Sequence, residues 1–212
     1  VVPPGFSLYL DKGTITGNVV VDFGGSLATT GGRIGGNLTS FGIVSDQGTW
    51  VGGNVKALTG GLAIGPDSTI GGNLTGSDLF ALCIVGTPSS HVRVGGNLTV
   101  QSLPFFVPPA TICSATVHGN LTYVSNEKPV DIGGAGCADF IGGNLVVVFN
   151  SAKVAVDDNI VGGNIAVSDN FGGTLLTNHA NGNCSLGPDY PMVIGSGNTV
   201  DDHHPNSCNE KA

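Results

Sequence analysis

Short stretches in which apolar and polar residues alternate recur along the chain, most of them directly after a Gly-Asn pair. An Asn preceded by Gly occurs ten times, and successive copies lie 15 to 24 residues apart. The residue two positions before this Asn is also Gly in six copies, so the repeat reads [IV]-G-G-N-[LVI]. Self-similarity at such a period indicates a repeat protein. The ten asparagines are Asn18, Asn37, Asn54, Asn73, Asn97, Asn120, Asn144, Asn164, Asn183 and Asn198.

The positions around each Asn predict a short strand on either side of a corner. In the first eight copies the third residue before it is β-branched, as in Ile15 and Ile34, and the residue after it is aliphatic, as in Val19 and Leu38. The next residue is mostly polar or small, as in Thr39. This alternation with a period of two is typical of a strand with one buried face. Because glycine accepts positive φ angles, we expect the Gly-Gly pair to turn the corner at positive φ.

Strands this short cannot bury their inner faces alone, but stacking one repeat on the next produces a continuous core. We predict an all-β fold, a single-stranded right-handed parallel β-helix (β-solenoid) of about nine coils of 17–24 residues. The corner asparagines should then form a ladder in which each side chain bonds to the coil above or below. Since sandwich strands recur about every 8–12 residues with mixed turns, an immunoglobulin-like sandwich or a four-bladed propeller fits less well.

The chain divides into three zones within one domain. Residues 1–16 alternate apolar and polar positions and are expected to form an N-terminal strand or cap over the open end. Residues 17–182 hold the regular coils. Residues 183–212 lose the aliphatic pattern and contain three prolines, as expected for a C-terminal cap stapled by a disulfide.

Composition and charge exclude several classes of protein. The 212 residues include 36 Gly, but 40% are hydrophobic, which is too many for a disordered glycine-rich tract. Gly does not recur every third residue as in collagen, and no apolar run is long enough for a membrane helix, so we expect no membrane span. With a formal net charge of −8 and no basic stripe, nucleic acid is not an expected partner.

The five cysteines predict two disulfide bonds. Cys113 and Cys137 each lie seven residues before a corner Asn, so both occupy one register in consecutive coils, within disulfide range. Cys184 and Cys208 bracket the tail, whereas Cys83 is either free or a competitor for Cys113. Oxidised pairs imply export. The alternative is five buried thiols in a reducing cytoplasm.

Few residues suggest chemistry, and we expect no catalytic residues, no metal site and no cofactor. The carboxylates are dispersed, with Asp157-Asp158 the one adjacent pair within the coils, and the run from Asp201 to His204 is expected to be a solvated tail. The corner asparagines Asn37, Asn73, Asn97 and Asn120 match the N-glycosylation sequon, but we assign them to the ladder. The candidate partner contacts are Phe105 and Phe106, in a loop that either folds back on the core or presents an apolar patch, and Trp50.

The repeats and the tail together resemble a group of uncharacterised secreted actinobacterial proteins. Those proteins consist of V-x-G-N-V and I-G-G-N-L repeats and end in a Cys, a G-N-T-V segment and a final Cys, matched here by Cys184, residues 197–200 and Cys208. The resemblance covers nearly the whole chain and implies export and a β-helix, with no enzyme activity. The wide middle coils and the Phe-rich loop depart from it. Bactofilins and filamentous-haemagglutinin-type adhesins share the solenoid but not the cysteine-framed tail.

The sequence therefore predicts an exported, non-enzymatic β-solenoid that acts as a cell-surface structural, adhesive or filament-forming protein. Its expected partner is itself, end to end or laterally, or a cell-surface polymer. A second hypothesis is a carbohydrate-binding or polysaccharide-processing β-helix, and a third is ice binding, for which one partial file of threonines is the only sign.

Overall fold

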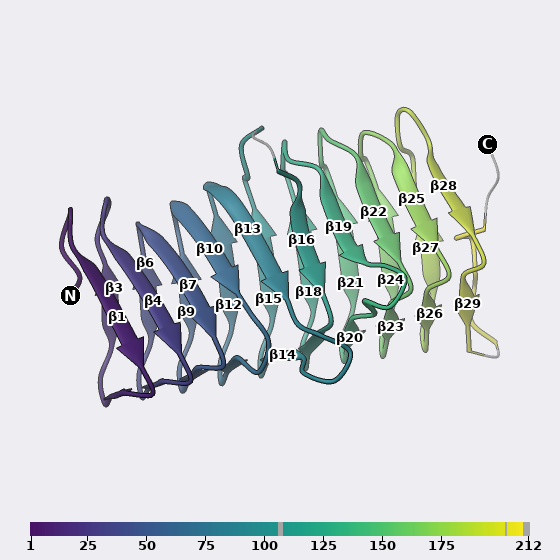
Figure 1. The fold of residues 1–212 in the computed structure, drawn as a ribbon. Helices are drawn as coiled ribbons and strands as arrows, with labels where there is room; N and C mark the ends of the chain where they lie inside the picture. Colours follow the sequence, from purple (N-terminus) through teal and green to yellow (C-terminus); the bar gives the residue numbers. More distant parts are fainter. Residues whose placement is uncertain (106–107, 202, 210–212) are drawn as a thin grey trace.

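The computed structural model describes residues 1–105, 108–201 and 203–209 and confirms the predicted fold. Within these ranges the chain forms strands and no helix, and it winds in a right-handed sense into a rod-like β-solenoid (Figure 1). Every strand pair is parallel, and three sheets run along the length of the rod. The part of the chain described holds no helix long and apolar enough to cross a membrane.

Sheet A contains the nine strands that follow the Gly-Asn corners. Its inner residues are almost all buried, while a single file of residues, including Thr39, Lys56 and Thr75, points outward in register. The strands of sheet A are β3 (Val19–Val21), β6 (Leu38–Ser40), β9 (Val55–Ala57), β12 (Leu74–Ser77), β15 (Leu98–Gln101), β18 (Leu121–Val124), β21 (Leu145–Val148), β24 (Ile165–Ser168) and β27 (Cys184–Leu186).

Sheet B has ten strands and faces the viewer in Figure 1. Its strands are β1 (Ser7–Asp11), β4 (Ser26–Thr30), β7 (Ile43–Gln47), β10 (Gly60–Ile64), β13 (Leu79–Val85), β16 (Ala110–Cys113), β19 (Val130–Gly133), β22 (Val154–Asp157), β25 (Gly173–Leu176) and β28 (Val193–Ser196).

Sheet C has ten strands of two or three residues each. They are β2 (Thr14–Ile15), β5 (Arg33–Ile34), β8 (Trp50–Val51), β11 (Thr69–Ile70), β14 (Val92–Val94), β17 (Ala115–Val117), β20 (Phe140–Ile141), β23 (Ile160–Val161), β26 (His179–Ala180) and β29 (Thr199–Val200). One coil thus runs through sheets B, C and A, and we name its three bends the B–C, C–A and A–B corners.

The core is a continuous column of aliphatic side chains from all three sheets. Ile70, Leu74 and Ile84 are fully buried, and equivalent residues of the coils above and below stack on them in register. Because side chains alternate across each strand, every second residue enters this column and the others face solvent. The repeat pattern of the sequence therefore corresponds directly to the core.

The expectation that the corner glycines have positive φ is wrong. None of the Gly-Gly pairs before the corner asparagines has a φ in that range, and the left-handed positions lie instead at the other two corners, for example Asp78, Phe149 and Asp158. The C–A corner needs glycine because the coils approach closely there. A Cβ atom on Gly71 would lie 2.5 Å from the carbonyl oxygen of Gly52 in the preceding coil.

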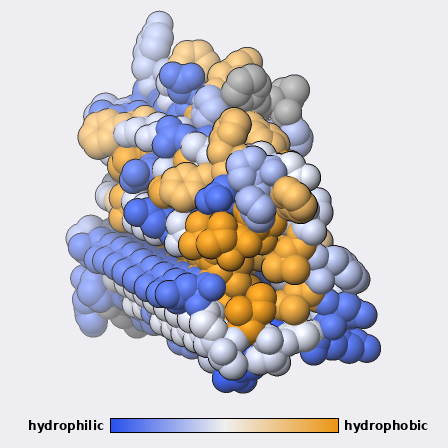
Figure 2. All heavy atoms as spheres, turned by 90° about the vertical axis from the view of Figure 1, so that its left-hand side faces the viewer, coloured by the Kyte–Doolittle hydropathy of each residue, from blue (hydrophilic) through white to orange (hydrophobic). Residues whose placement is uncertain are grey.

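The two ends of the rod differ. At the N-terminal end Val2 pairs with β3, and β1 and β2 join the first coil, so residues 1–16 are part of the solenoid. Leu8 and Leu10 pack against the core but remain partly exposed, and hydrophobic residues lie in the middle of this end face (Figure 2). At the other end, β27, β28 and β29 continue the three sheets, and the tail then folds over them.

Candidate functional site

The predicted asparagine ladder forms at the C–A corner from Asn18 to Asn183. The backbone N–H of each asparagine from Asn37 onward donates to Oδ1 of the corner Asn in the preceding coil, at 2.8 Å in all eight steps. The side chains are exposed or half-buried, and a regular row of hydrophilic residues runs along one edge of the molecule (Figure 2). Each of these Oδ1 atoms, including those of the sequon asparagines, therefore holds one coil on the next.

Asn198 does not belong to this ladder, although its Gly-Asn context predicted that it would. Its Oδ1 accepts a hydrogen bond from the backbone N–H of Asn178 at 3.0 Å, inside the B–C corner. The next asparagine of that inner column is Asn159, and Asn209 of the tail extends it beyond Asn198. The C–A ladder instead ends at Asn183, whose Oδ1 lies 3.2 Å from Nδ1 of His204.

A second inner column, formed by Asn126, Asn150 and Asn170, lies inside the A–B corner. In both inner columns the N–H of one residue donates to the side chain of the following coil, opposite in sense to the C–A ladder. The three amides are buried, and the Nδ2 of Asn170 also donates to the carbonyl of Val147 at 2.9 Å. Sequence reasoning missed both columns, although their spacing of 19 to 24 residues matches the repeat.

Each inner column has an aspartate at one end. Asp139 accepts a hydrogen bond from the N–H of Ala115 through Oδ1, and its Oδ2 has no hydrogen-bond partner among the described residues. Burial raises the pKa of Asp139 to about 7. Asp189 ends the A–B column in the same way, with Oδ1 on the N–H of Asn170 at 2.7 Å and Oδ2 unpaired in the described part of the chain. Burial raises its pKa as well.

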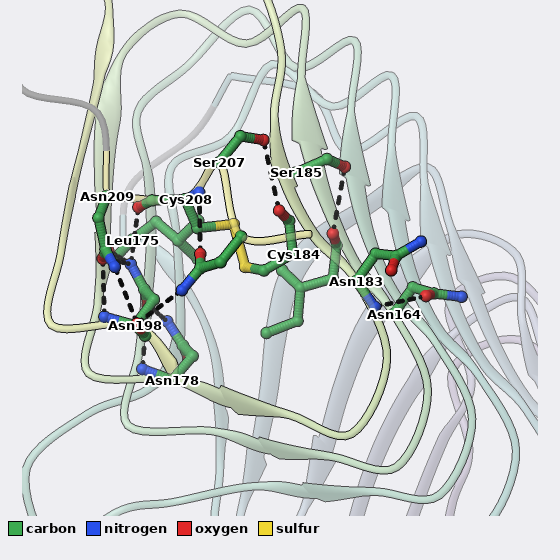
Figure 3. The surroundings of a disulfide bond; sticks show 12 residues. Asn164, Leu175, Asn178, Asn183, Cys184, Ser185, Asn198, Ser207, Cys208 and Asn209 are labelled. Carbon is green, nitrogen blue, oxygen red and sulfur yellow. Dashed lines mark hydrogen bonds between the residues drawn. A yellow bond between two sulfur atoms is a disulfide. The ribbon is translucent and has the colours of Figure 1, made fainter. Parts of the chain in front are cut away.

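Both predicted disulfides are present. Cys113 and Cys137 are joined with a Cα–Cα distance of 5.1 Å, and Cys184 and Cys208 with 5.5 Å. The Cys184–Cys208 bond holds the tail against the end of the rod. There Nδ2 of Asn198 donates a hydrogen bond to the carbonyl of Cys208 (Figure 3). Cys83 is free and exposed, next to Thr111 in register, so it does not compete for Cys113.

Trp50 and Phe105, two of the candidate partner contacts, lie on different sides of the rod. Trp50 is half-buried on the outer face of sheet C, and the Cζ atom of Arg33 is 3.7 Å from its ring centroid, a cation–π contact within the lateral face. Phe105 follows β15 at the A–B corner and is 67% exposed. Phe106 lies outside the described residues.

The loop that holds Phe105 is anchored in the core at one point. Leu103 is fully buried, and its N–H donates to Oδ1 of Asn126 at 2.9 Å. Beneath this corner Nζ of Lys128 donates to the carbonyl of Phe80 at 2.7 Å, and burial lowers the pKa of Lys128. The loop therefore does both things that the sequence allowed: Leu103 joins the core and Phe105 faces solvent.

Phe105 is part of a larger feature that sequence reasoning missed. Among the described residues, an exposed aromatic residue follows seven of the nine strands of sheet A, six of them at the A–B corner and Phe80 at the start of β13, and we call this set the aromatic corner. Counted along the chain, the intervals are irregular because the A–B loops differ in length, which hides the set in the sequence. The residues are Phe23, Phe41, Phe80, Phe105, Phe149, Phe171 and Tyr190.

Three surface hollows accompany the aromatic corner in the C-terminal half. The largest, of about 450 Å³, is lined by Asn150, Ser151, Asp169, Asn170, Phe171, Pro188, Asp189 and Tyr190. A hollow of about 360 Å³ shares Asp189 and adds Met192, and one of about 220 Å³ lies between the loop at Ser102–Pro104 and Glu127. Aromatic rings and side-chain oxygens together line the largest of these hollows.

The remaining polar clusters do not converge. Asp157 accepts from the N–H of Leu176 and the hydroxyl of Thr174, whereas Asp158 accepts from the hydroxyl of Thr177, so both carboxylates bond to the next coil. Nε2 of His179, in β26, lies 3.4 Å from Oδ1 of Asp201, in the tail. Within residues 1–105, 108–201 and 203–209, no three His, Cys, Asp or Glu side chains gather as metal ligands.

Comparison with protein-family models, with curated proteins and with solved structures finds no match to this chain.

Proposed function

We propose that this protein is an exported, non-enzymatic rod that acts at a cell surface as a structural and adhesive element. The single observation that carries the proposal is the use of the polar groups. The Asn side chains that recur at the corners bond to the neighbouring coil, as in the C–A ladder, and the carboxylates of Asp157 and Asp158 do the same. Such bonds favour a rigid scaffold over a convergent reactive centre.

Export is supported by the two disulfides. Bonds such as Cys113–Cys137 form and persist in oxidising compartments, and bonds between neighbouring coils stiffen a rod that works without chaperones outside the cell. The resemblance to secreted repeat proteins points in the same direction.

Fractionation of the source cells tests this proposal. We expect the protein in the medium or the wall fraction, labelled on intact cells by an impermeant amine reagent, with both disulfides intact in non-reducing mass spectrometry. A cytoplasmic pool with five free thiols would overturn the export claim. Depolymerisation of any polysaccharide in a panel assayed with and without calcium would overturn the non-enzymatic claim.

Self-association, a second candidate role, is favoured at the N-terminal end alone. Strand β1 has a free edge there, with neither proline nor charge between Ser7 and Leu10 to block pairing. At the opposite end the tail pairs with β27 through Cys184 and Asn206, and the carbonyl of Cys208 lies against the inward face of Gly195, so the tail covers the end of the last coil. We therefore expect rods joined in pairs rather than open filaments.

Sedimentation velocity over a range of concentrations distinguishes these states. The chain should show a monomer–dimer equilibrium that Tyr9→Lys shifts toward monomer, because an outward lysine on an edge strand opposes pairing. Long filaments in electron micrographs would contradict pairing through one end.

A further inference from the structure

The aromatic corner is a feature of the surface rather than part of the core. Its rings are between 37% exposed at Phe41 and 88% exposed at Tyr190. In the coils of Phe149 and Phe171 the inner side of the same corner is filled by the buried column of Asn126, Asn150 and Asn170, so these two rings are not part of the core. Exposed apolar residues that gather along one edge of a protein mark an interaction surface.

The polar groups beside the rings indicate the chemical class of the partner. The hollow between Phe171 and Tyr190 is also lined by Ser151 and by the carboxylate residues Asp169 and Asp189. Aromatic faces pack against the C–H faces of sugar rings, and amide and carboxylate oxygens accept hydrogen bonds from sugar hydroxyls. Few polar groups placed among apolar walls are what a specific ligand site requires.

The charge of this corner and the recurrence of its rings limit the chemical class of the partner further. Glu127, Asp169 and Asp189 line the hollows of this corner, and the exposed cation among its loops is Lys153. An acidic polymer such as a uronan or a nucleic acid would be repelled, in agreement with the net charge of −8. Aromatic residues that recur along the axis of the rod suit a linear polymer, which presents similar faces along its length.

We propose that the aromatic corner binds an uncharged polysaccharide chain lying parallel to the axis of the rod, centred on the hollow between Phe171 and Tyr190. The chain crosses the hollows in the C-terminal half and continues over Phe149 and Phe105. This proposal names the partner of the proposed adhesive role and rests on it for biological meaning, whereas the binding itself is a property of the isolated protein.

Binding of the purified chain to insoluble cellulose, curdlan, mannan and chitin tests the proposal, with pectate as the acidic control and affinity electrophoresis on soluble forms. We expect one or more neutral polymers to retain the protein and pectate not to. Phe171→Ala and Tyr190→Ala should each weaken that binding about tenfold, and Phe149→Ala less. All three side chains are exposed, so the variants should unfold at the parent temperature.

Tyr9→Ala is the matched control, because Tyr9 is 65% exposed on the outer face of sheet B, away from the aromatic corner. Retention by none of the neutral polymers, stronger binding to pectate, or equal loss in Tyr9→Ala and Tyr190→Ala would overturn the proposal. So would a dimer that Tyr190→Ala dissolves, since the corner would then bind a second copy. If the protein is found at the cell surface but binds no neutral glycan, this inference fails and the proposed role stands. If it is found in the cytoplasm but binds a neutral glycan, the proposed role fails and this inference stands.

Discussion

A Cβ atom on Gly143 would lie 2.5 Å from Oδ1 of Asn120, one coil earlier in the C–A ladder. The same oxygen accepts the N–H of Asn144 at 2.8 Å. The glycine before each corner asparagine is thus required by the asparagine of the preceding coil. Gly17 has no coil beneath it, and a Cβ atom there would meet nothing within 4 Å.

Gly143→Ala should therefore destabilise the protein by about 1–3 kcal/mol, the usual cost of overpacking a close contact. Gly17→Ala, at the same position of the repeat, should change the free energy of unfolding by less than about 0.5 kcal/mol. Thermal and denaturant unfolding of the two variants checks the contrast. Equal losses in both would mean that the backbone conformation, and not the ladder, demands glycine.

A double-mutant cycle isolates the contact between the two residues. Asn120→Ala alone should cost about 1 kcal/mol, through the lost hydrogen bond to Asn144. Combined with Gly143→Ala it should cost less than the sum of the two single variants, because the smaller side chain leaves room for the new methyl group. Strict additivity would refute the proposed steric coupling.

Asp139→Asn should stabilise the protein at neutral and alkaline pH. The variant supplies an amide nitrogen where Asp139 has the unpaired Oδ2, as Asn159 does in the next coil, where Nδ2 donates to the carbonyl of Ile132 at 3.0 Å. In the parent protein the pKa of Asp139 is about 7 in the folded state, against 3.8 ordinarily. Stability measured from pH 4 to pH 9 checks the gain.

The sign of the pH dependence follows from the raised pKa of Asp139. As pH rises between 3.8 and about 7, the unfolded chain loses the proton and the folded one keeps it, so the free energy of unfolding falls and then levels off. The total fall is at most roughly 4 kcal/mol. Asp139→Asn should abolish it, and Asp131→Asn, an exposed site in the same coil, should not. An unchanged pH profile in Asp139→Asn would contradict this assignment.

Loss of the Cys184–Cys208 bond should free the tail before it affects the coils. This bond closes a separation of 24 residues, and removing one of such length costs about 3 kcal/mol. In Cys208→Ala, limited proteolysis should cut first between Val200 and the C-terminus. Cys83→Ser, a cysteine outside both disulfides, should keep the parent digestion pattern. Early cleavage inside the coils would mean that the tail supports the whole rod.

Cys83 should be the one cysteine among those described that is alkylated without reduction. Its side chain is exposed, yet partial burial raises the pKa of the thiol. Because the thiolate is the reactive form, the ratio of the iodoacetamide reaction rate at pH 9 to the rate at pH 7 should be larger than for a free model thiol. Mass spectrometry should find one adduct on the native protein. It should find two further adducts for each disulfide that a reductant opens. Five adducts without reductant would contradict both disulfides.

The sequence predicts the parts of this fold that depend on local repetition. The β-branched and aliphatic positions around each Gly-Asn pair specify inward-facing strands, and Cys113 and Cys137 could be paired because both are counted from the same corner. Gly197-Asn198 shows where this reasoning fails. It has the letters of the C–A repeat, yet Asn198 stacks inside the B–C corner on Asn178, since the preceding strand, and not the dipeptide, determines which corner it occupies.

The sequence by itself determined that the chain is a solenoid, because strands with a hydrophobic period of two that return to the same Gly-Asn corner bury their apolar faces by stacking one repeat on the next. Only the tertiary structure decided what the surface presents. Phe105, Phe149, Phe171 and Tyr190 stand at unequal intervals in the chain and reach one edge because loops of different length close the same corner. The buried amide columns and the two aspartates at their ends likewise exist only through contacts between coils, which no local pattern encodes.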